Sequence, residues 1–380
     1  MISELSFTLS QMVVWVSQNR SAILLASCLI LGGAGALVMA GMPFRESLLD
    51  IPNDRSSHHA PIPRGGGIGI LVAFLVAGIS LRLPTTFLFS AILVSLVSFY
   101  GDFLRISVKF RLYVQILAAL IFLFPLLPRL TAYYAEFSGE SSPVFIVFLL
   151  PILLFYLIGT TNFYNFMDGI DGMAGMTGFI AFTLIGTYTL YSLPPPDVLT
   201  TSLAWLSLCI ALACLGFLPF NVPRARVFMG DVGSILLGFV FAAMVISTAR
   251  NFREILFFTA CLFPFYADEL STMSIRLVNR ENLFSSHRRH LYQILANEAG
   301  FAHWKITAIY GLVQIAIAAG VFMVMQKDYW VIILFLTGCS AAFTALGFCV
   351  RKKYSSILIK RIRGNILNGS SSCCQGKHEI

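Results

Sequence analysis

Residues 143–193 read PVFIVFLLPILLFYLIGTTNFYNFMDGIDGMAGMTGFIAFTLIGTYTLYSL. Two apolar runs, each long enough to cross a bilayer as a helix of roughly 20 residues, enclose a polar stretch from Asn162 to Gly172. This stretch carries two carboxylates and two carboxamides between glycines. Acidic side chains at the edge of a membrane are costly to keep. The segment therefore predicts two membrane helices with a functional site at the turn between them.

The same apolar pattern repeats along the chain. Its 380 residues are 57% hydrophobic and only 12% charged, with a mean hydropathy of +0.82, which excludes an ordinary soluble domain. We expect an all-α polytopic integral membrane protein with about eleven transmembrane helices, near residues 21–43, 66–82, 85–100, 112–128, 143–161, 174–193, 199–220, 232–249, 255–272, 305–326 and 329–350. Residues 1–20 form a lead-in, 21–350 the transmembrane domain, and 351–380 a basic tail that we expect to be disordered.

Lysines and arginines sort the loops into two sides. Of the 26 in the chain, 20 fall in one set of loops and 6 in the other; the richer set comprises 44–65, 101–111, 221–231, 273–305 and the tail. The positive-inside rule places that set in the cytoplasm. The N-terminus is then periplasmic and the C-terminus cytoplasmic.

Every polar motif falls on this predicted cytoplasmic side, whereas the span centres are almost free of charge. The exceptions are Asp268 and Glu269, near the cytoplasmic end of span 255–272. This one-sidedness favours an enzyme over a transporter or flippase for a lipid-linked sugar, which would need polar groups at mid-membrane. The net charge of +8 comes largely from the tail; we expect it to contact anionic lipid rather than nucleic acid.

The first polar loop, 50–67, reads DIPNDRSSHHAPIPRGGG. Its prolines favour an extended path, and Gly65–Gly67 allow close backbone approach at the entrance of a helix, where an anion can bind. Arg55 and Arg64, with two histidines between them, are donors suited to phosphate. The alternative is a cytoplasmic loop whose charges only fix topology.

Acidic residues mark the next two loops. Asp168 and Asp171 lie three residues apart between glycines, and their carboxylates, with the carboxamide of Asn165, are the oxygen ligands that Mg²⁺ prefers. The alternative is a helix N-cap run, which would explain one aspartate. Asp102 is the single acid of 101–111 and lies just beyond a span, where it is either functional or an ordinary helix-end residue.

Two further motifs complete the set. In 220–234, Asp231 stands at a glycine-flanked helix entrance, while Asn221 and Phe228 suit a base by hydrogen bonding and stacking; Phe228 alternatively packs at the interface. In 285–293, a histidine and arginine cluster that includes Arg288 predicts a diphosphate clamp. Zinc is less favoured because no Cys or Glu lies at zinc-ligand spacing there.

Taken in order, five motifs resemble those of the polyprenyl-phosphate N-acetylhexosamine-1-phosphate transferases, which are glycosyltransferase family 4 and include the enzyme that makes the first lipid-linked peptidoglycan precursor. They are 50–67, 102–109, 162–172, 221–234 and 287–293. The resemblance covers roughly residues 22–350 and implies a reaction. A polyprenyl phosphate such as undecaprenyl phosphate attacks the β-phosphate of a UDP-N-acetylhexosamine, which releases UMP, with Mg²⁺ (or Mn²⁺) as cofactor.

The resemblance also implies roles for single residues. Asp102 and Asp168 are implied catalytic acids, one of which deprotonates the lipid phosphate. The other implied roles are Asp231 and Asn165 as metal ligands, Asp171, Asn221 and Phe228 at the uridine, and His287, Arg288 and His290, with Arg55 and Arg64, at the diphosphate.

The sequences of two motifs indicate which branch of the family the chain resembles. The forms RSSH…PRGGG and HRRHLYQ resemble the branch that initiates O-antigen and lipopolysaccharide glycans, which implies N-acetylglucosamine, N-acetylfucosamine or N-acetylquinovosamine as the sugar. One position departs from the family, which usually has two adjacent aspartates where this chain has Gly101 and Asp102. An inactive family member is therefore a further alternative. A homodimer is compatible with the sequence.

Overall fold

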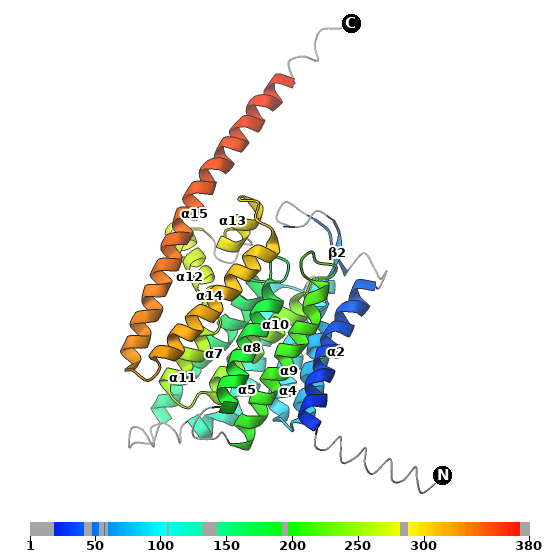
Figure 1. Ribbon diagram of the computed structural model, residues 1–380, viewed down its shortest axis with the longest axis vertical. Helices are drawn as coiled ribbons and strands as arrows, with labels where there is room; N and C mark the ends of the chain where they lie inside the picture. The colour runs from blue at the N-terminus through cyan, green and yellow to red at the C-terminus, as the bar shows by residue number, and fades with distance from the viewer. Residues whose placement is uncertain are drawn as a thin grey trace, which may run out of the picture.

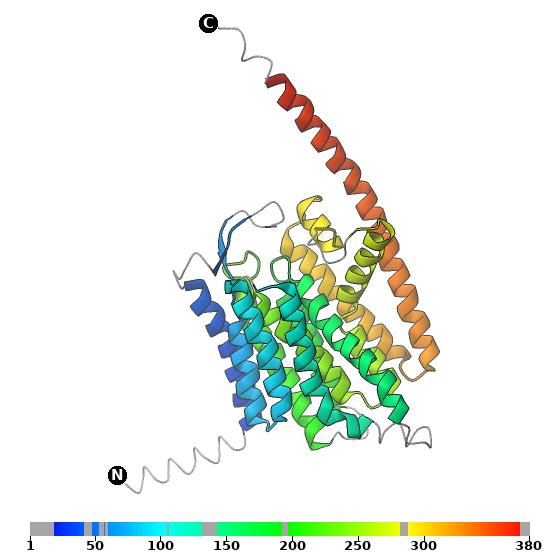
Figure 2. The same cartoon turned by 180° about the vertical axis from the view of Figure 1, so that it is seen from behind.

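The computed structural model describes residues 19–41, 48–52, 57, 60–104, 106–130, 143–191, 197–281 and 288–372, except for the side chains of 102, 103, 143–146 and 355–372. The long helices pack side by side along one direction (Figures 1 and 2). The helices of the first half are α2 (Arg20–Gly41), α3 (Ile68–Ser80), α4 (Thr85–Leu104), α5 (Val108–Leu123), η2 (Phe124–Leu126), α7 (Pro143–Phe166) and α8 (Met173–Tyr191). Those of the second half are α9 (Val198–Phe217), η3 (Leu218–Phe220), α10 (Asp231–Thr248), α11 (Phe252–Ala260), α12 (Phe263–Val278), α13 (Leu291–Asn297), α14 (His303–Val324) and α15 (Tyr329–Ser372).

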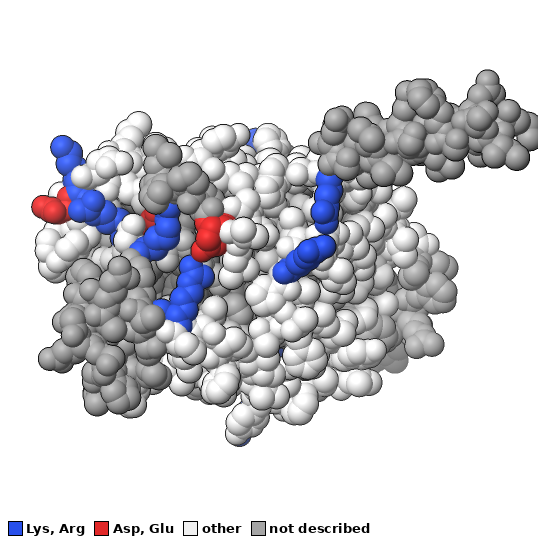
Figure 3. All heavy atoms as spheres, turned by 90° about the horizontal axis from the view of Figure 1, so that it is seen from below, with Lys and Arg blue, Asp and Glu red and all other residues white. Residues whose placement is uncertain are grey.

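The helices confirm an all-α polytopic membrane protein. Within the described ranges, eight helices are long and apolar enough to cross a membrane, and α3 and most of α4 are shorter apolar helices. The end of the bundle that carries α13 also carries the short antiparallel hairpin of β1 (Leu49–Asp50) and β2 (Ile62–Pro63) (Figure 1). The opposite end shows only scattered charged side chains on a largely uncharged surface (Figure 3). Which end faces the cytoplasm stays a prediction.

The expected span 255–272 is divided into two helices. α11 ends at Ala260, and α12 begins at Phe263 with Pro264 in its first turn. Proline lacks the N–H that would continue a helix, so it is tolerated at a helix start but breaks a helix interior. The break re-aims α12, which carries Asp268 and Glu269. The last helix, α15, continues past the expected end at residue 350 and is described to Ser372.

Glycines let the helices touch through their backbones. A Cβ atom added to Gly67, at the start of α3, would stand 2.5 Å from the Cα of Gly233 in α10. A Cβ on Gly35 of α2 would likewise stand 2.3 Å from the Cα of Gly69 in α3. Membrane helices associate without a strong hydrophobic drive, and small residues at the interface allow close van der Waals packing. These contacts fix α2, α3 and α10 relative to one another.

The close contact of α3 with α10 is extended by main-chain hydrogen bonds between loops. The N–H groups of Gly66 and Gly67 donate to the carbonyls of Phe228 and Met229, both at 2.9 Å, and Phe228 N donates to Pro63 O at 2.8 Å. Gly65 and Gly230 adopt positive φ angles of 94° and 73° on either side of this contact, which favours glycine. The first polar loop is thereby docked onto the loop that leads to Asp231.

We predict that Gly67→Ala destabilises the protein, because the new methyl group meets the backbone of Gly233, which cannot move aside as a flexible side chain would. Overpacking of this kind costs about 1–3 kcal/mol. Gly159, in α7, has no atom within 4 Å of an added Cβ, so Gly159→Ala is the matched control. Thermal unfolding in detergent should show a lower Tm for Gly67→Ala and an unchanged or higher Tm for Gly159→Ala. Equal Tm values would contradict the close packing.

Candidate active site

Asp231 is the centre of the first polar cluster. It opens α10, and its Oδ2 lies 2.6 Å from Nη1 of Arg111, which reaches across from α5. Its Oδ1 accepts a hydrogen bond of 2.9 Å from Nδ2 of Asn165, near the end of α7, and that amide also donates to Ser234 Oγ at 2.8 Å. Both members of the ion pair are partly exposed. Three helices thus bring a carboxylate, a carboxamide and a guanidinium to one solvent-accessible point.

A second asparagine of the same motif has a different role. Asn162 lies one turn earlier in α7, where its Nδ2 donates to Gln115 Oε1 at 2.7 Å and to Ile158 O at 2.8 Å. Gln115 is buried on α5. This amide pair joins α5 to α7 directly behind the Asp231 cluster. It therefore stabilises the helices that carry Arg111 and Asn165.

The two predicted catalytic acids lie in segments whose neighbouring residues contact this cluster. Asp168 lies half-buried in the turn after α7, where its N–H donates to Asn165 O at 3.2 Å. Asp102 lies in the last turn of α4, and its side chain is outside the described residues. A Cβ on its neighbour Gly101 would stand 3.2 Å from Cδ of Arg111. Gly101 therefore faces the arginine that pairs with Asp231.

Asp171 belongs to a second cluster. Its Oδ2 accepts a hydrogen bond of 3.2 Å from Ala225 N and lies 3.2 Å from Nδ1 of His303, at the start of α14. Its carbonyl accepts a hydrogen bond of 2.9 Å from Thr307 Oγ1. The residue predicted at the uridine is thus held by α14 and by the 221–230 loop.

Asn221 joins the same two loops. Its Oδ1 accepts a hydrogen bond of 2.6 Å from Gly172 N, and its Nδ2 donates to Val227 O at 2.9 Å. The side chain is 5% exposed, and its contacts fix the 171–172 turn against the loop that carries Phe228, which is half-buried. In this structure Asn221 shapes the site, and its contact with a base stays a prediction.

The arginines and histidines predicted at the diphosphate are only partly described. Arg64 pairs with Asp50 at 2.7 Å and is 41% exposed, while Arg288 is half-buried. Arg55 and His287 lie outside the described residues. Their roles stay predictions.

His290 differs from an exposed phosphate donor. Its side chain is 3% exposed and stacks on the ring of Tyr292, with centroids 5.6 Å apart. Burial lowers the pKa of His290 below its ordinary value. The imidazole is therefore neutral at neutral pH, and its approach of 3.4 Å to Oε2 of Glu269 is not an ion pair. These contacts make His290 a buried packing residue of the segment before α13.

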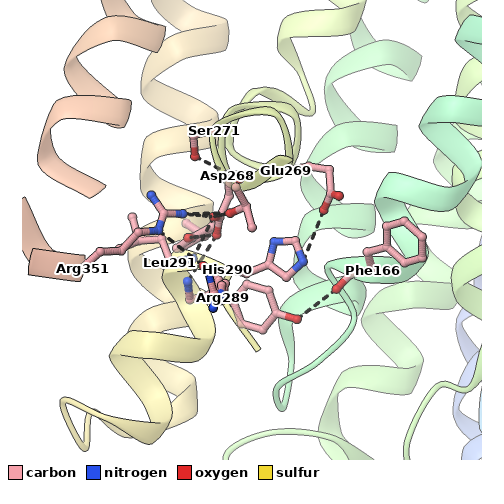
Figure 4. A network of polar contacts seen from close by, with 11 residues as sticks. Phe166, Asp268, Glu269, Ser271, Arg289, His290, Leu291 and Arg351 are labelled. Atoms are coloured by element: carbon pink, nitrogen blue, oxygen red, sulfur yellow. Dashed lines mark hydrogen bonds and ion pairs between the residues drawn. The ribbon is translucent and has the colours of Figure 1, made fainter. Parts of the chain in front are cut away.

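One contact connects the histidine segment to the acidic turn. The hydroxyl of Tyr292 donates to Phe166 O at 3.0 Å, next to Asn165 (Figure 4). A Cβ on Gly169 would stand 2.2 Å from this hydroxyl, so only glycine leaves room for it. The turn after α7 is therefore packed against α13, between the Asp231 cluster and the histidine segment.

Comparisons with known proteins point to one family of transferases. The model of glycosyl transferase family 4 matches residues 84–249, which include Asp102, the acidic turn and Asp231. The chain is 28% identical over 310 residues to the undecaprenyl-phosphate alpha-N-acetylglucosaminyl 1-phosphate transferase of Thermotoga maritima. The aligned region covers 81% of this chain and 91% of the relative. These matches support a relationship between the chain and glycosyl transferase family 4. It is also 27% identical over 128 residues to the phospho-N-acetylmuramoyl-pentapeptide-transferase of Staphylococcus aureus, over 34% of this chain and 38% of the relative.

The fit of this site to a divalent cation depends on the side chains of Asp231 and Asn165. Among the described residues, no three His, Cys, Asp or Glu side chains converge in a way that would hold a metal ion. Mg²⁺, however, commonly takes one or two protein carboxylates together with phosphate oxygens, and Asp231 beside Asn165 supplies oxygens of that kind. In the structure Asn165 turns its Nδ2 toward Asp231. The same amide presents Oδ1 there after rotation about its last bond.

Sequence reasoning missed two partners in this site. Arg111 counted only toward membrane topology, and His303 was not considered. No sequence pattern indicated the role of Arg111, because it meets Asp231 across 120 residues. No sequence pattern indicated His303, because its contact with Asp171 spans 132 residues and depends on how α14 packs.

We predict that acidification destabilises the protein through His290. The pKa of this histidine is lowered in the folded state and is about 6.5 when unfolded, so the folded state binds fewer protons in that window. The contribution is present above about pH 6.5 and is lost as pH falls, by at most about 1.4 kcal/mol per pH unit. Unfolding measured from about pH 7.5 to 5.5 should therefore show a steeper loss for the native chain than for His290→Gln. Equal slopes would contradict the neutral, buried state of His290.

Proposed function

We propose that this protein transfers N-acetylhexosamine-1-phosphate from a UDP-sugar to undecaprenyl phosphate or a similar polyprenyl phosphate, releasing UMP. The observation that carries the proposal is the cluster of Asp231, Asn165 and Arg111 at one end of a membrane bundle. The end of the first polar loop is docked by main-chain hydrogen bonds onto the segment that leads to Asp231. The Thermotoga maritima relative, which matches most of the chain, is named for a transfer of this kind.

Phosphoryl transfer depends mainly on positioning the reactants and neutralising their charge, and it requires little covalent chemistry from the protein. Arg111 offers a guanidinium that binds a phosphate in place of Asp231, with which it is paired in the structure. Asp168 lies half-buried in the turn after α7. We propose it as the group that accepts the proton of the lipid phosphate. Asp102, close to Gly101 and Arg111 in the chain fold, is the second candidate.

The nucleotide fits the second cluster. Asp171 has acceptor capacity beyond its bonds to Ala225 and His303, and Phe228 offers a ring for stacking. Asn221 holds the two loops together. The diphosphate would then lie between this cluster and Asp231, within reach of the histidine–arginine segment and the first loop.

We further propose that Asp231 and Asn165 hold Mg²⁺, or Mn²⁺ in its place. When bound, the cation neutralises negative charge on the diphosphate. Removal of divalent cations with EDTA should abolish UMP release, and added Mg²⁺ should restore it, as measured by a coupled UMP assay. Full activity in EDTA would overturn the metal assignment.

The form of the first and last motifs supports a place at the start of O-antigen or lipopolysaccharide glycan synthesis. The sugar would then be N-acetylglucosamine or a deoxy relative. An inactive family member is the second candidate, and Gly101 is the observation that favours it. Binding of a UDP-sugar without turnover, together with turnover restored by Gly101→Asp, would support that candidate.

We predict that Asp231→Asn lowers UMP release by about 100-fold or more, because it removes the charge that pairs with Arg111 and would hold the cation. The matched control is Asp197→Asn at the opposite end of the bundle. Asp197 caps α9 by accepting a hydrogen bond of 2.7 Å from Thr200 N, and asparagine keeps an acceptor there. Purified variants with UDP-sugar, undecaprenyl phosphate and Mg²⁺ supply the measurement. Normal activity of Asp231→Asn would contradict the proposal.

A further inference from the structure

Asp268 is a completely buried carboxylate that the proposed reaction does not use. It lies in α12, and five donors from four parts of the chain surround it (Figure 4). Its Oδ1 accepts from Leu291 N at 2.8 Å, Thr272 Oγ1 at 3.2 Å and Arg351 Nη2 at 3.2 Å; its Oδ2 accepts from Tyr310 Oη at 2.7 Å and Tyr292 N at 3.2 Å. A buried charge persists only when it is paired and hydrogen-bonded. Both conditions are met here.

The positive partner comes from the last helix. Arg351 lies on α15 where that helix passes the end of the bundle, and its Nη2 donates to Thr272 Oγ1 at 2.8 Å as well as to Asp268. Its Nε donates to Arg289 O at 3.4 Å. One arginine therefore contacts both α12 and the segment that precedes α13. The last helix carries no group assigned to the reaction.

The other side of Asp268 leads toward the candidate active site. The carboxylate fixes two consecutive amides, Leu291 and Tyr292, immediately after Arg288–His290. Tyr292 then donates through its hydroxyl to Phe166 O, next to Asn165. A contiguous set of contacts thus runs from α15 through Asp268 and Tyr292 to the turn that carries Asp168.

The short α13 needs this support. It has seven residues, and an isolated helix of that length is unstable in water because nucleation is costly. The orientation of Arg288–Tyr292 is therefore set by tertiary contacts, of which the bonds to a buried charge are the strongest. Arg288, in this segment, is predicted at the diphosphate, so a displaced segment should bind the UDP-sugar more weakly.

We propose that Asp268 is a positioning residue for the transfer reaction, with Arg351 as its counter-ion. The pair holds Arg288–Tyr292 against the acidic turn, so that α15 sets the geometry of a site to which it contributes no reacting group. This inference rests on the proposed function. The inference adds Asp268 and Arg351 to the residues on which transfer depends. It also makes the geometry of the site depend on α15.

The test compares Asp268→Asn, Arg351→Gln and the double variant with Lys352→Gln, which removes an exposed charge from the next residue of the same helix. Hydrogen exchange on the full chain in detergent should be about tenfold faster at the Leu291 and Tyr292 amides in the first three variants. The Lys352→Gln control should exchange at the native rate. Unchanged exchange in Arg351→Gln overturns the coupling, whether or not the chain transfers sugar.

Kinetics on the same samples test the positioning role. The KM for the UDP-sugar should rise about tenfold in Asp268→Asn and in Arg351→Gln, and the rise in the double variant should be smaller than the two effects combined, because both residues hold the same segment. Loss of folded enzyme lowers kcat alone. A fall in kcat with unchanged KM, or additive effects in the double variant, overturns the proposal. Absence of transfer by the native chain overturns the proposed function and the positioning role together, while the exchange data still decide the coupling.

Discussion

The hydrogen bonds from Gly66 and Gly67 to Phe228 and Met229 are the contact on which the rest of the site depends. They form because α3 and α10 meet without side chains at Gly67 and Gly233. This contact fixes the start of α10, and with it Asp231, relative to the first polar loop. α5 and α7 are then joined by the pair of Gln115 and Asn162, which aims their arginine and asparagine at the same carboxylate.

Charge balance explains how an apolar chain keeps so many acids at one end. Asp231 pairs with Arg111 and Asp268 pairs with Arg351, while Asp171 accepts a hydrogen bond from Ala225 N. The first carboxylate is accessible to ligands, whereas the last is completely buried. Removing one partner of a buried pair is strongly destabilising, so Asp268 and Arg351 stay paired in the folded protein. The accessible pair, by contrast, is the one that we propose to take up a phosphate or a cation.

Hydropathy predicted the membrane bundle well, because spans of about 20 apolar residues carry a strong signal. It did not predict the break at Pro264, since a proline inside an apolar run also fits a kinked helix. The short α13 was missed for a related reason, because seven residues give too little periodicity to detect. Both errors fall in the region where Asp268 acts.

The candidate site was predicted in part. The sequence singled out Asp231 and Asn165, and the structure brings their side chains within 2.9 Å. The pairing of Asp231 with Arg111 could not be predicted, because 120 residues separate them and their contact depends on how α5 and α10 both pack against α4 and α7. Asp268 and Glu269 stood out as the exceptions in an apolar span. Their connection to α13 and α15 required the fold.

The most direct test of the central claim is a panel of UDP-sugars incubated with the purified protein, undecaprenyl phosphate and Mg²⁺, with mass detection of the lipid product. The account predicts a lipid diphospho-sugar for at least one UDP-N-acetylhexosamine, formed in equal amount with UMP. No lipid product across the whole panel would contradict it, as would movement of a lipid-linked sugar across vesicles without release of UMP.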